Sequence, residues 1–295
     1  MAMPAHSRSL IRWLVPAVGL GWLSMGASAS LAGDEVVTAV FSSVHNGYTR
    51  TRLPDGSFKP ETYAFGEGVF GEGRMRDSSI DKLPFLELAT ALSRHLARQQ
   101  YLPAKTPAAA NLLIVVSWGT SIPYDEPGYQ AGLADLQAAS MPSAEGMPMG
   151  NTSGASSMLS MLNTLRDKAN ARNAALLGYS SELSRVSALH PFLGLLSRTT
   201  HYSDLISDLE EDRYYVILAA YDFPLAWEKK QLKLLWVTRV SLRMHRNGFD
   251  KRLDDMARSA SRYFGQDSPG LVRQPVDHDS KIEIGEPKVI ELPAR

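Results

Sequence analysis

Two uninterrupted apolar runs stand out in the pattern of hydrophobic and polar positions. Residues 112–116 are apolar without a break, and residues 214–221 form a second, longer run. Both are too short to cross a membrane and are rich in β-branched or aromatic residues, which is typical of strands covered on both faces. Gly119 and Pro123 follow the first run closely and disfavour a helix of ordinary length. We therefore expect these two strands to be companions in the middle of a sheet.

Four further segments are predicted to be extended. Residues 35–43 alternate and are β-branched. Residues 48–52 and 57–65 flank Pro54-Asp55-Gly56, a combination that favours a tight turn and hence a hairpin. Residues 231–244 alternate most cleanly, which predicts one buried face and one wet face. Residues 66–73 hold four glycines and are expected to be irregular.

Apolar residues at a spacing of three and four predict the helices. A helix capped by Asp81, with Pro84 in its first turn, is expected to run to Gln99. Another follows the Asn247-Gly248 turn and ends before Gly265. Residues 156–211 also have helical spacing, whereas residues 122–151 are punctuated by proline and glycine.

This order of elements predicts an α/β (α+β) fold, a mixed sheet packed with helices and carrying a mainly helical insertion. We divide the chain into a signal peptide (1–32), an N-terminal half of the α/β domain (33–120), a loop and helical insertion (121–212), a C-terminal half (213–268) and a polar tail (269–295). Within the tail, residues 281–284 and 288–292 are candidate edge strands.

The first 32 residues have the layout of a secretory signal. Arg8 and Arg12 form a basic start, and residues 13–25 are largely apolar. Either Ala27-Ser28-Ala29 or Ser30-Leu31-Ala32 offers small residues at cleavage spacing. A retained anchor is the alternative, disfavoured by Pro16 and the shortness of the stretch. Since no later segment is apolar enough to cross a bilayer, we expect an exported protein, periplasmic or extracellular, without a transmembrane segment after cleavage.

Composition and charge remove several function classes. The chain has no cysteine, which excludes disulfides, thiol catalysis and cysteine-ligated zinc. The 31 basic and 31 acidic residues cancel, so nothing favours a nucleic-acid partner. The seven histidines show no metal-ligand spacing, and no metal or cofactor is expected. A G-x-G-x-x-G spacing at Gly66, Gly68 and Gly71 opens no helix and is flanked by acidic residues, so we interpret it as coincidence.

Three features remain as candidate sites. The first is the end of the first apolar strand, where Trp118, Thr120 and Ser121 come to the surface and the insertion leaves. The second is the wet strand face carrying Lys233, Arg239 and Arg243, which could meet an anionic surface such as phospholipid headgroups. The third is a group of methionines suited either to packing and partner contact or to Cu(I), namely Met141, Met147, Met149, Met158 and Met161.

Two segments resemble a known group of proteins. Residues 112–120 and 235–268, with Trp236-Val-Thr-Arg239, Asn247-Gly-Phe249-Asp250 and Tyr263-Phe-Gly265, are similar to uncharacterised exported bacterial envelope proteins of small α/β architecture, some of them lipoproteins. The resemblance covers about a third of the chain. Because that group has no assigned activity, it implies no catalytic residues. The chain lacks the cysteine that anchors the lipoprotein members.

The sequence thus favours a non-enzymatic envelope protein, a binding or structural module that uses the insertion as its contact surface, with another envelope protein or an anionic envelope surface as partner. The alternative is a secreted hydrolase or a methionine-rich metal-binding protein that uses the loop after residue 121. No catalytic residue can be named for either. A deep pocket with histidine and carboxylates would favour the enzyme, and exposed methionines and leucines on the insertion would favour binding.

Overall fold

The computed structural model describes residues 36–74, 76–124, 152–188, 195–244 and 247–276. The chain divides into two units, Met1–Asp34 and Glu35–Arg295, and the description concerns the second. The expected signal peptide lies outside the described residues, as do the candidate strands at 281–284 and 288–292 and most of the proline-punctuated segment that precedes the helical insertion.

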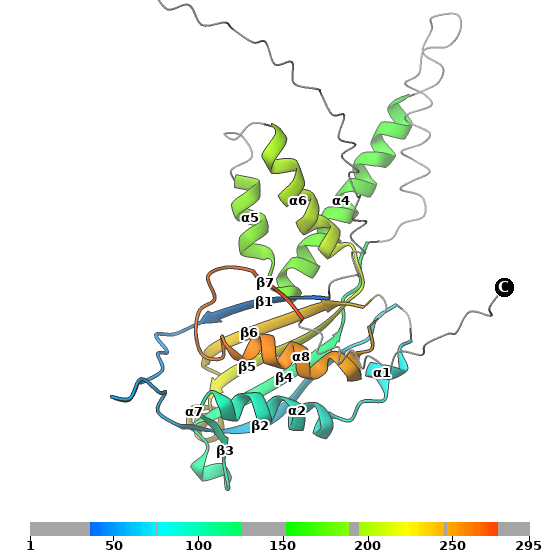
Figure 1. Ribbon diagram of the computed structural model, residues 1–295. Helices are drawn as coiled ribbons and strands as arrows, with labels where there is room; N and C mark the ends of the chain where they lie inside the picture. Colours follow the sequence, from blue (N-terminus) through cyan, green and yellow to red (C-terminus); the bar gives the residue numbers. More distant parts are fainter. Residues whose placement is uncertain (1–35, 75, 125–151, 189–194, 245–246, 277–295) are drawn as a thin grey trace, which may run out of the picture. The chain divides into compact units, whose positions relative to one another are not determined.

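The described strands form one mixed sheet of seven, in the order β3-β2-β4-β5-β6-β1-β7 (Figure 1). β2 is parallel to β3 and β4, and the remaining pairs are antiparallel. The predicted α/β class with a mixed sheet is confirmed. The strands are β1 Val37–Val44, β2 Glu61–Gly71, β3 Tyr101–Pro103, β4 Leu112–Thr120, β5 Arg213–Asp222, β6 Leu234–Arg243 and β7 Val272–Pro275.

The two apolar runs are neighbours at the middle of the sheet, as predicted. β4 pairs with β5 along its whole length, from Leu112 opposite Asp222 to Thr120 opposite Tyr214. One residue further, the Ser121 amide donates to the Arg213 carbonyl at 2.8 Å. The insertion therefore begins and ends at two positions that are already hydrogen-bonded to each other.

One face of the sheet is covered by the helices α1 (Ser78–Asp81), α2 (Phe85–Arg98) and α8 (Phe249–Ser261), which lie across it in Figure 1. Both long helices present apolar residues at helical spacing to the strands, as the sequence predicts. Alternate strand residues complete this larger core, which includes Leu88, Leu92, Leu112, Ile114, Val116, Val216, Trp236, Phe249 and Phe264.

The insertion packs on the opposite face. Its helices are α4 (Thr152–Leu177), α5 (Ser180–Ala188) and α6 (Leu195–Leu209), and they form a smaller core against β1 and β5. Ala39 and Tyr215 contribute to this core, whereas their chain neighbours Val40 and Tyr214 belong to the larger one, so the two cores lie on opposite sides of the sheet. The helical part of the predicted insertion is confirmed.

The prediction that residues 66–73 are irregular is wrong in part, since β2 continues to Gly71, although its register with β4 shifts between Glu67 and Phe70. The glycines are used for close approach within the sheet: a Cβ on Gly68 would overlap the Ser117 hydroxyl, and one on Gly71 would overlap the Tyr215 hydroxyl. The predicted hairpin is reduced to an isolated bridge between Arg52 and Phe58. β2 pairs with β3 and β4 instead.

The prediction that residues 112–116 are covered on both faces is also wrong in part. Leu112, Ile114 and Val116 are fully buried under α2 and α8, but Leu113 and Val115 on the other face are half-buried. The smaller core forms against β1 and β5, and none of its described residues belongs to β2 or β4. This less covered part of the sheet becomes the floor of a hollow.

Candidate functional site

The short helix α7 (Phe223–Lys229), which the sequence analysis missed, builds the hollow. Asp222 caps it, since its carboxylate accepts from the Leu225 amide at 3.1 Å, and Pro224 takes a first-turn position where no amide is needed. The helix ends at Lys230, which has a left-handed backbone with φ 55°. The Phe223 amide donates to the Asn111 carbonyl at 3.0 Å, which fixes α7 to the start of β4.

Two aromatic side chains one helical turn apart lie against each other on α7. The rings of Phe223 and Trp227 are stacked, with centroids 5.7 Å apart and planes 12° from parallel. Phe223 is buried, whereas Trp227 is 59% exposed. The Lys230 ammonium lies over the Trp227 ring, 5.3 Å from its centre. A large aromatic surface is thus held in a fixed orientation and remains open to solvent.

The opposite wall is the segment between β3 and β4, which contains the 3-10 turn η1 (Pro107–Ala109). It is fastened to β2 by backbone hydrogen bonds, from Ala104 to the Tyr63 carbonyl at 2.8 Å and from Asn111 to the Thr62 carbonyl at 2.9 Å. The Thr62 hydroxyl also donates to the Asn111 side chain at 2.8 Å. Both walls are therefore set by hydrogen bonds to the sheet.

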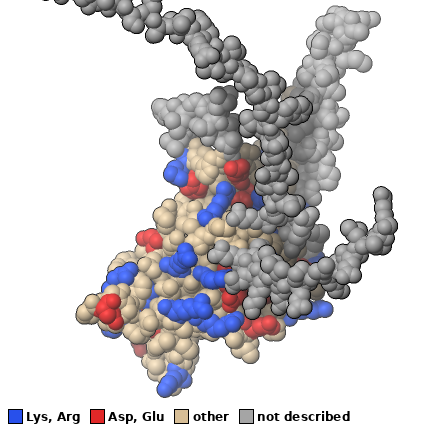
Figure 2. Space-filling model, in the orientation of Figure 1, with Lys and Arg blue, Asp and Glu red and all other residues tan. Residues whose placement is uncertain are grey.

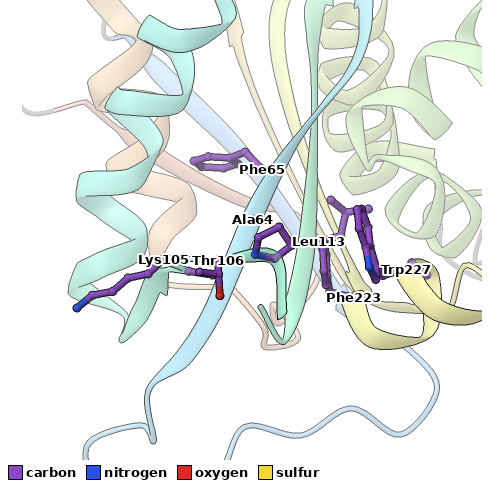
Figure 3. Close-up of a pocket in the computed structure, with 10 residues that line it drawn as sticks. Ala64, Phe65, Lys105, Thr106, Leu113, Phe223 and Trp227 are labelled. Atoms are coloured by element: carbon purple, nitrogen blue, oxygen red, sulfur yellow. The ribbon is translucent and has the colours of Figure 1, made fainter. Parts of the chain in front are cut away.

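Between these walls lies a hollow of about 490 Å³, here called the α7 hollow (Figure 3). In Figure 3, Phe223 and Trp227 lie together on one side of β2 and β4, while Lys105 extends away from them on the other. The half-buried Leu113 of the central strand forms part of the floor. The lining residues are Ala64, Phe65, Ala104, Lys105, Thr106, Pro107, Leu113, Phe223, Ala226 and Trp227.

The chemistry of the α7 hollow is that of a binding site for an apolar group. Its described lining includes no histidine or acidic residue, and Lys105 is its charged side chain. Nowhere in the described part of the chain do three or more histidine or acidic side chains gather in a way that could hold a metal ion. Concave, mostly apolar sites of this size commonly take small molecules or parts of larger ones.

The connection that follows α7 adds apolar and basic side chains to the same end of the molecule. Leu232 is 70% exposed, and Lys229, Lys230 and Lys233 are all exposed. Glu228 is the exposed acidic residue among residues 227–233. The α7 hollow is therefore bordered by an exposed tryptophan, an exposed leucine and three lysines.

The predicted site at the end of the central strand is filled by the protein itself. Trp118 is buried and its ring contacts those of Phe70 and Phe85, at 5.6 and 5.7 Å. Ser121 is fully buried, and its hydroxyl accepts from the Arg213 amide at 3.1 Å. Thr120 is also buried and lies against Gly73. These three buried residues act in packing and in closing the β4–β5 pair.

The structure also separates Lys233, Arg239 and Arg243. Lys233 precedes β6, and the ten residues from there to Arg243 span roughly 33 Å of extended chain. Arg243 is occupied by ion pairs with Glu211 at 2.7 Å and Asp208 at 3.4 Å. The face predicted to be wet also carries the buried Ser241 and is covered in part by the insertion.

Arg239 is half-buried on this face, opposite Phe41 of β1 and Ile217 of β5. Burial lowers the pKa of its guanidinium, and its Nε has no hydrogen-bond partner. Figure 2 shows lysine and arginine side chains gathered over the face that α2 and α8 form.

The methionines divide between described and undescribed segments. Met141, Met147 and Met149 lie outside the described residues. Met158 and Met161 are exposed on α4, at 57% and 65%, and Leu165 follows one turn later at 40%. These three side chains form an apolar stripe at helical spacing, here called the α4 stripe.

Phe223 and Trp227 carry the best-formed site, although sequence reasoning did not select them. The signal was present, because Asp222 precedes Pro224 as a cap precedes a first-turn proline, and the two aromatic residues are four apart.

No described helix is both long and apolar enough to cross a membrane.

Comparison with known proteins gives no family. No protein-family model and no curated protein matches the chain. One solved structure that is similar is a PDZ domain protein from Parabacteroides distasonis ATCC 8503, with 12% sequence identity and a TM-score of 0.33. The match covers 81% of this chain but only 39% of that one. At this TM-score the likeness supports no inference, and the resemblance to exported envelope proteins stays a prediction.

Proposed function

We propose that this chain is an exported, non-enzymatic envelope protein that binds an anionic lipid surface through the α7 hollow and the residues around it. The observation that carries the proposal is the exposed Trp227, held by Phe223 at the mouth of an apolar hollow. Tryptophan is well suited to the boundary between water and hydrocarbon, because its ring is apolar and its N–H is polar.

The neighbouring side chains support a lipid partner. Leu232 would enter the apolar layer with Trp227, while Lys229, Lys230 and Lys233 would remain at headgroup level. Each lysine near an anionic bilayer contributes about 1 kcal/mol of attraction. The 490 Å³ hollow would accept part of an acyl chain against Leu113 and Phe223. Of the predicted basic set, this proposal keeps Lys233. Arg239 and Arg243 are replaced as contact residues by Trp227, Lys229, Lys230 and Leu232.

Vesicle binding tests the proposal. The full chain should bind phosphatidylglycerol vesicles at low salt, bind phosphatidylcholine vesicles weakly, and be released at high salt because counter-ions screen the lysines. Trp227→Ala should weaken binding roughly 10-fold, in line with the loss of one large buried aromatic side chain. Lys233→Glu should weaken it by a similar factor.

Two matched controls test whether the vesicle contact lies at the α7 end of the molecule. Leu86→Ala removes an exposed apolar side chain on α2, and Lys251→Glu reverses an exposed charge on α8. Neither should change vesicle binding. Absence of binding to phosphatidylglycerol at low salt would overturn the proposal. So would a larger effect from Lys251→Glu than from Lys233→Glu, since that would favour the α2 and α8 face.

The α4 stripe supports a second candidate function, docking of another envelope protein on the insertion. Exposed methionines adapt to different partners, and Met158, Met161 and Leu165 offer anchors at the spacing of a helix-in-groove contact. A photo-crosslinking residue at Met161 should give a discrete adduct in cells, whereas the same residue at the exposed Asp167 on that helix should not. Equal labelling at both positions, or none at Met161, would remove this candidate.

A further inference from the structure

A second hollow, separate from the α7 hollow, contains an unusually placed arginine. It has a volume of about 270 Å³ and lies between the β1–β2 connection and the turn after α8. We call it the Arg50 hollow. It shares no lining residue with the α7 hollow, and its polar and charged lining is chiefly Tyr48, Arg50, Arg52 and Asp267.

Arg50 is only 6% exposed and is held between two aromatic rings. Its guanidinium carbon lies 3.9 Å from the centre of the Phe58 ring and 4.2 Å from that of Tyr101. Its Nη2 donates to the Gln99 carbonyl at 2.5 Å. Its Nε and Nη1 have no hydrogen-bond partner at all. A buried cation with two unused donors is costly, and such groups normally have a partner.

A second arginine is near. Arg52 is exposed, and its guanidinium carbon lies 4.3 Å from the centre of the same Phe58 ring. Its Nη1 donates to the Gly56 carbonyl at 3.1 Å. Neither arginine forms an ion pair with any described residue. Two guanidinium groups therefore gather around one ring without a carboxylate between them.

The acidic residues of this region are engaged elsewhere. Glu61 accepts a hydrogen bond of 2.9 Å from the Tyr48 hydroxyl, which is itself 3.0 Å from the hydroxyl of Tyr101. Burial raises the pKa of Glu61, while the hydrogen bond from Tyr48 and the charge of Arg50 oppose this rise. Asp267 accepts from the Val44 amide at 2.8 Å. Neither of these carboxylates satisfies the open donors of Arg50.

We propose that the Arg50 hollow binds a carboxylate group, with Arg50 and Arg52 as its cationic partners. Guanidinium groups recognise carboxylates through charge-assisted hydrogen bonds. A singly charged carboxylate fits better than a doubly charged phosphate, because Asp267 lines the same hollow and repels an anion in proportion to its charge. The hollow accommodates a small molecule or the end of a larger one, so the carboxylate can belong to a metabolite or to a peptide C-terminus.

The test uses the full chain and follows the Arg50 Nε–H signal by NMR. Sodium acetate, inorganic phosphate, a trialanine peptide with a free C-terminus and the same peptide amidated are titrated separately. Acetate should shift the signal saturably, and phosphate should bind more weakly. Tighter binding of the free peptide than of acetate, with no binding of the amide, would identify a peptide terminus as the source. Equal affinity for acetate and free peptide would identify a small carboxylate.

Variants distinguish this site from general attraction to positive charge. Arg52→Gln, at an exposed position where folding is not at risk, should weaken acetate binding about 10-fold through the loss of a charge-assisted bond. Arg98→Gln, at an exposed position on α2, should leave it unchanged. Arg50→Lys should abolish the binding if the variant folds. The absence of a saturable shift, tighter binding of phosphate than of acetate, or equal effects of Arg52→Gln and Arg98→Gln would overturn the proposal.

Discussion

Asp208 on α6 holds the insertion to the sheet through hydrogen bonds from arginine side chains of the strands. This buried carboxylate on α6 accepts from Arg213 Nη1 at 3.0 Å on β5 and from Arg243 Nη2 at 3.4 Å on β6. It also accepts from Arg273 on β7 at 2.5 Å and from the Tyr179 hydroxyl at 3.2 Å. Arg213 is itself buried and donates its Nε to Ser241 at 3.2 Å. The Asp208 carboxylate thus contacts arginine side chains of three strands, β5, β6 and β7.

Replacing this aspartate should be costly. Asp208→Asn leaves Arg213 buried without a full counter-charge, and we expect it to lower the free energy of unfolding by about 3–5 kcal/mol. Urea denaturation followed by far-UV circular dichroism measures the change. Asp204→Asn, at an exposed position one turn earlier on α6, is the control and should stay within about 0.5 kcal/mol of wild type. A loss for Asp208→Asn as small as the control's would contradict this role.

Among the elements, α2 and α8 are joined above their apolar surface by polar contacts that meet at Asp254, since Arg94 lies 3.5 Å from this carboxylate and His95 lies nearer still. His95 Nε2 on α2 and Asp254 Oδ1 on α8 are 3.0 Å apart, and His95 is buried. The hydrogen bond with His95 lowers the pKa of the Asp254 carboxyl, against the opposing effect of burial, and the charge of Arg94 adds to the lowering. The two helices that cover the sheet are therefore linked by a group that titrates in acid.

The stability that this link provides should depend on pH. Because the pKa of Asp254 is lower in the folded than in the unfolded chain, its contribution is present above the ordinary carboxyl range and is lost as the pH falls through the folded value. The difference in Tm between wild type and Asp254→Asn should be largest near neutral pH and shrink below about pH 4. Thermal unfolding across this range measures it. Glu67→Gln, an exposed carboxylate on β2, should show no such trend.

The close approach of β2 to Tyr215 depends on the absence of a side chain at Gly71. Gly71→Ala places a Cβ against the Tyr215 hydroxyl and should destabilise the protein by about 1–3 kcal/mol, as overpacking does. Tyr215→Phe removes the obstructing oxygen, so the double variant should recover part of this loss. Chemical denaturation of the four proteins of the cycle gives the coupling energy. If the losses in free energy of unfolding of the two single variants simply add in the double variant, the new Cβ does not contact the Tyr215 hydroxyl.

The elements differ in how well the sequence predicts them. The β4–β5 pair, α2, α8 and the helical insertion were all predicted, because each has a long, regular apolar pattern. β3 and β7 were not, since strands of three and four residues at a sheet edge carry almost no periodicity. β2 was misread because glycine usually signals a break, whereas here Gly68 and Gly71 make room for Ser117 and Tyr215.

The sites were harder to predict than the fold. Trp118, Thr120 and Ser121 were selected because they follow a buried strand, but the same strand keeps them inside. Arg50 and Trp227 were not selected, because their positions depend on which distant residues surround them. Tyr101 and Phe58 reach Arg50 from separate segments, and Asn111 sets the place of α7. Contacts of this kind cannot be read from local pattern.

At the scale of the whole molecule, the two faces of the sheet are covered to different extents. Among the described residues, the larger core beneath α2 and α8 contains none from the insertion, whereas the smaller core depends on it. β4 and β5 already meet at Ser121 and Arg213, so the insertion occupies the position of a hairpin turn. The α/β body should therefore fold without the insertion.

Excision tests this independence. Replacing residues 122–212 by Asn-Gly joins Ser121 to Arg213 through a favoured two-residue turn. The shortened chain should keep a cooperative unfolding transition and near-UV circular dichroism from Trp118 and Trp236. It should also bind more of an apolar dye, because Tyr215 and Ile217 lose their cover. A molten or unfolded product would show that the insertion is needed for the body to fold.

The position of β1 has a consequence for how the chain reaches this structure. β1 lies between β6 and β7, and Val40 pairs with Val240, which is 200 residues later in the chain. Contacts so distant in sequence slow folding, because a long loop must close before they form. Among the described strands, β1 is synthesised first, but it cannot pair until β6 has been synthesised. During folding, β1 therefore stays unpaired for longer than the other described strands.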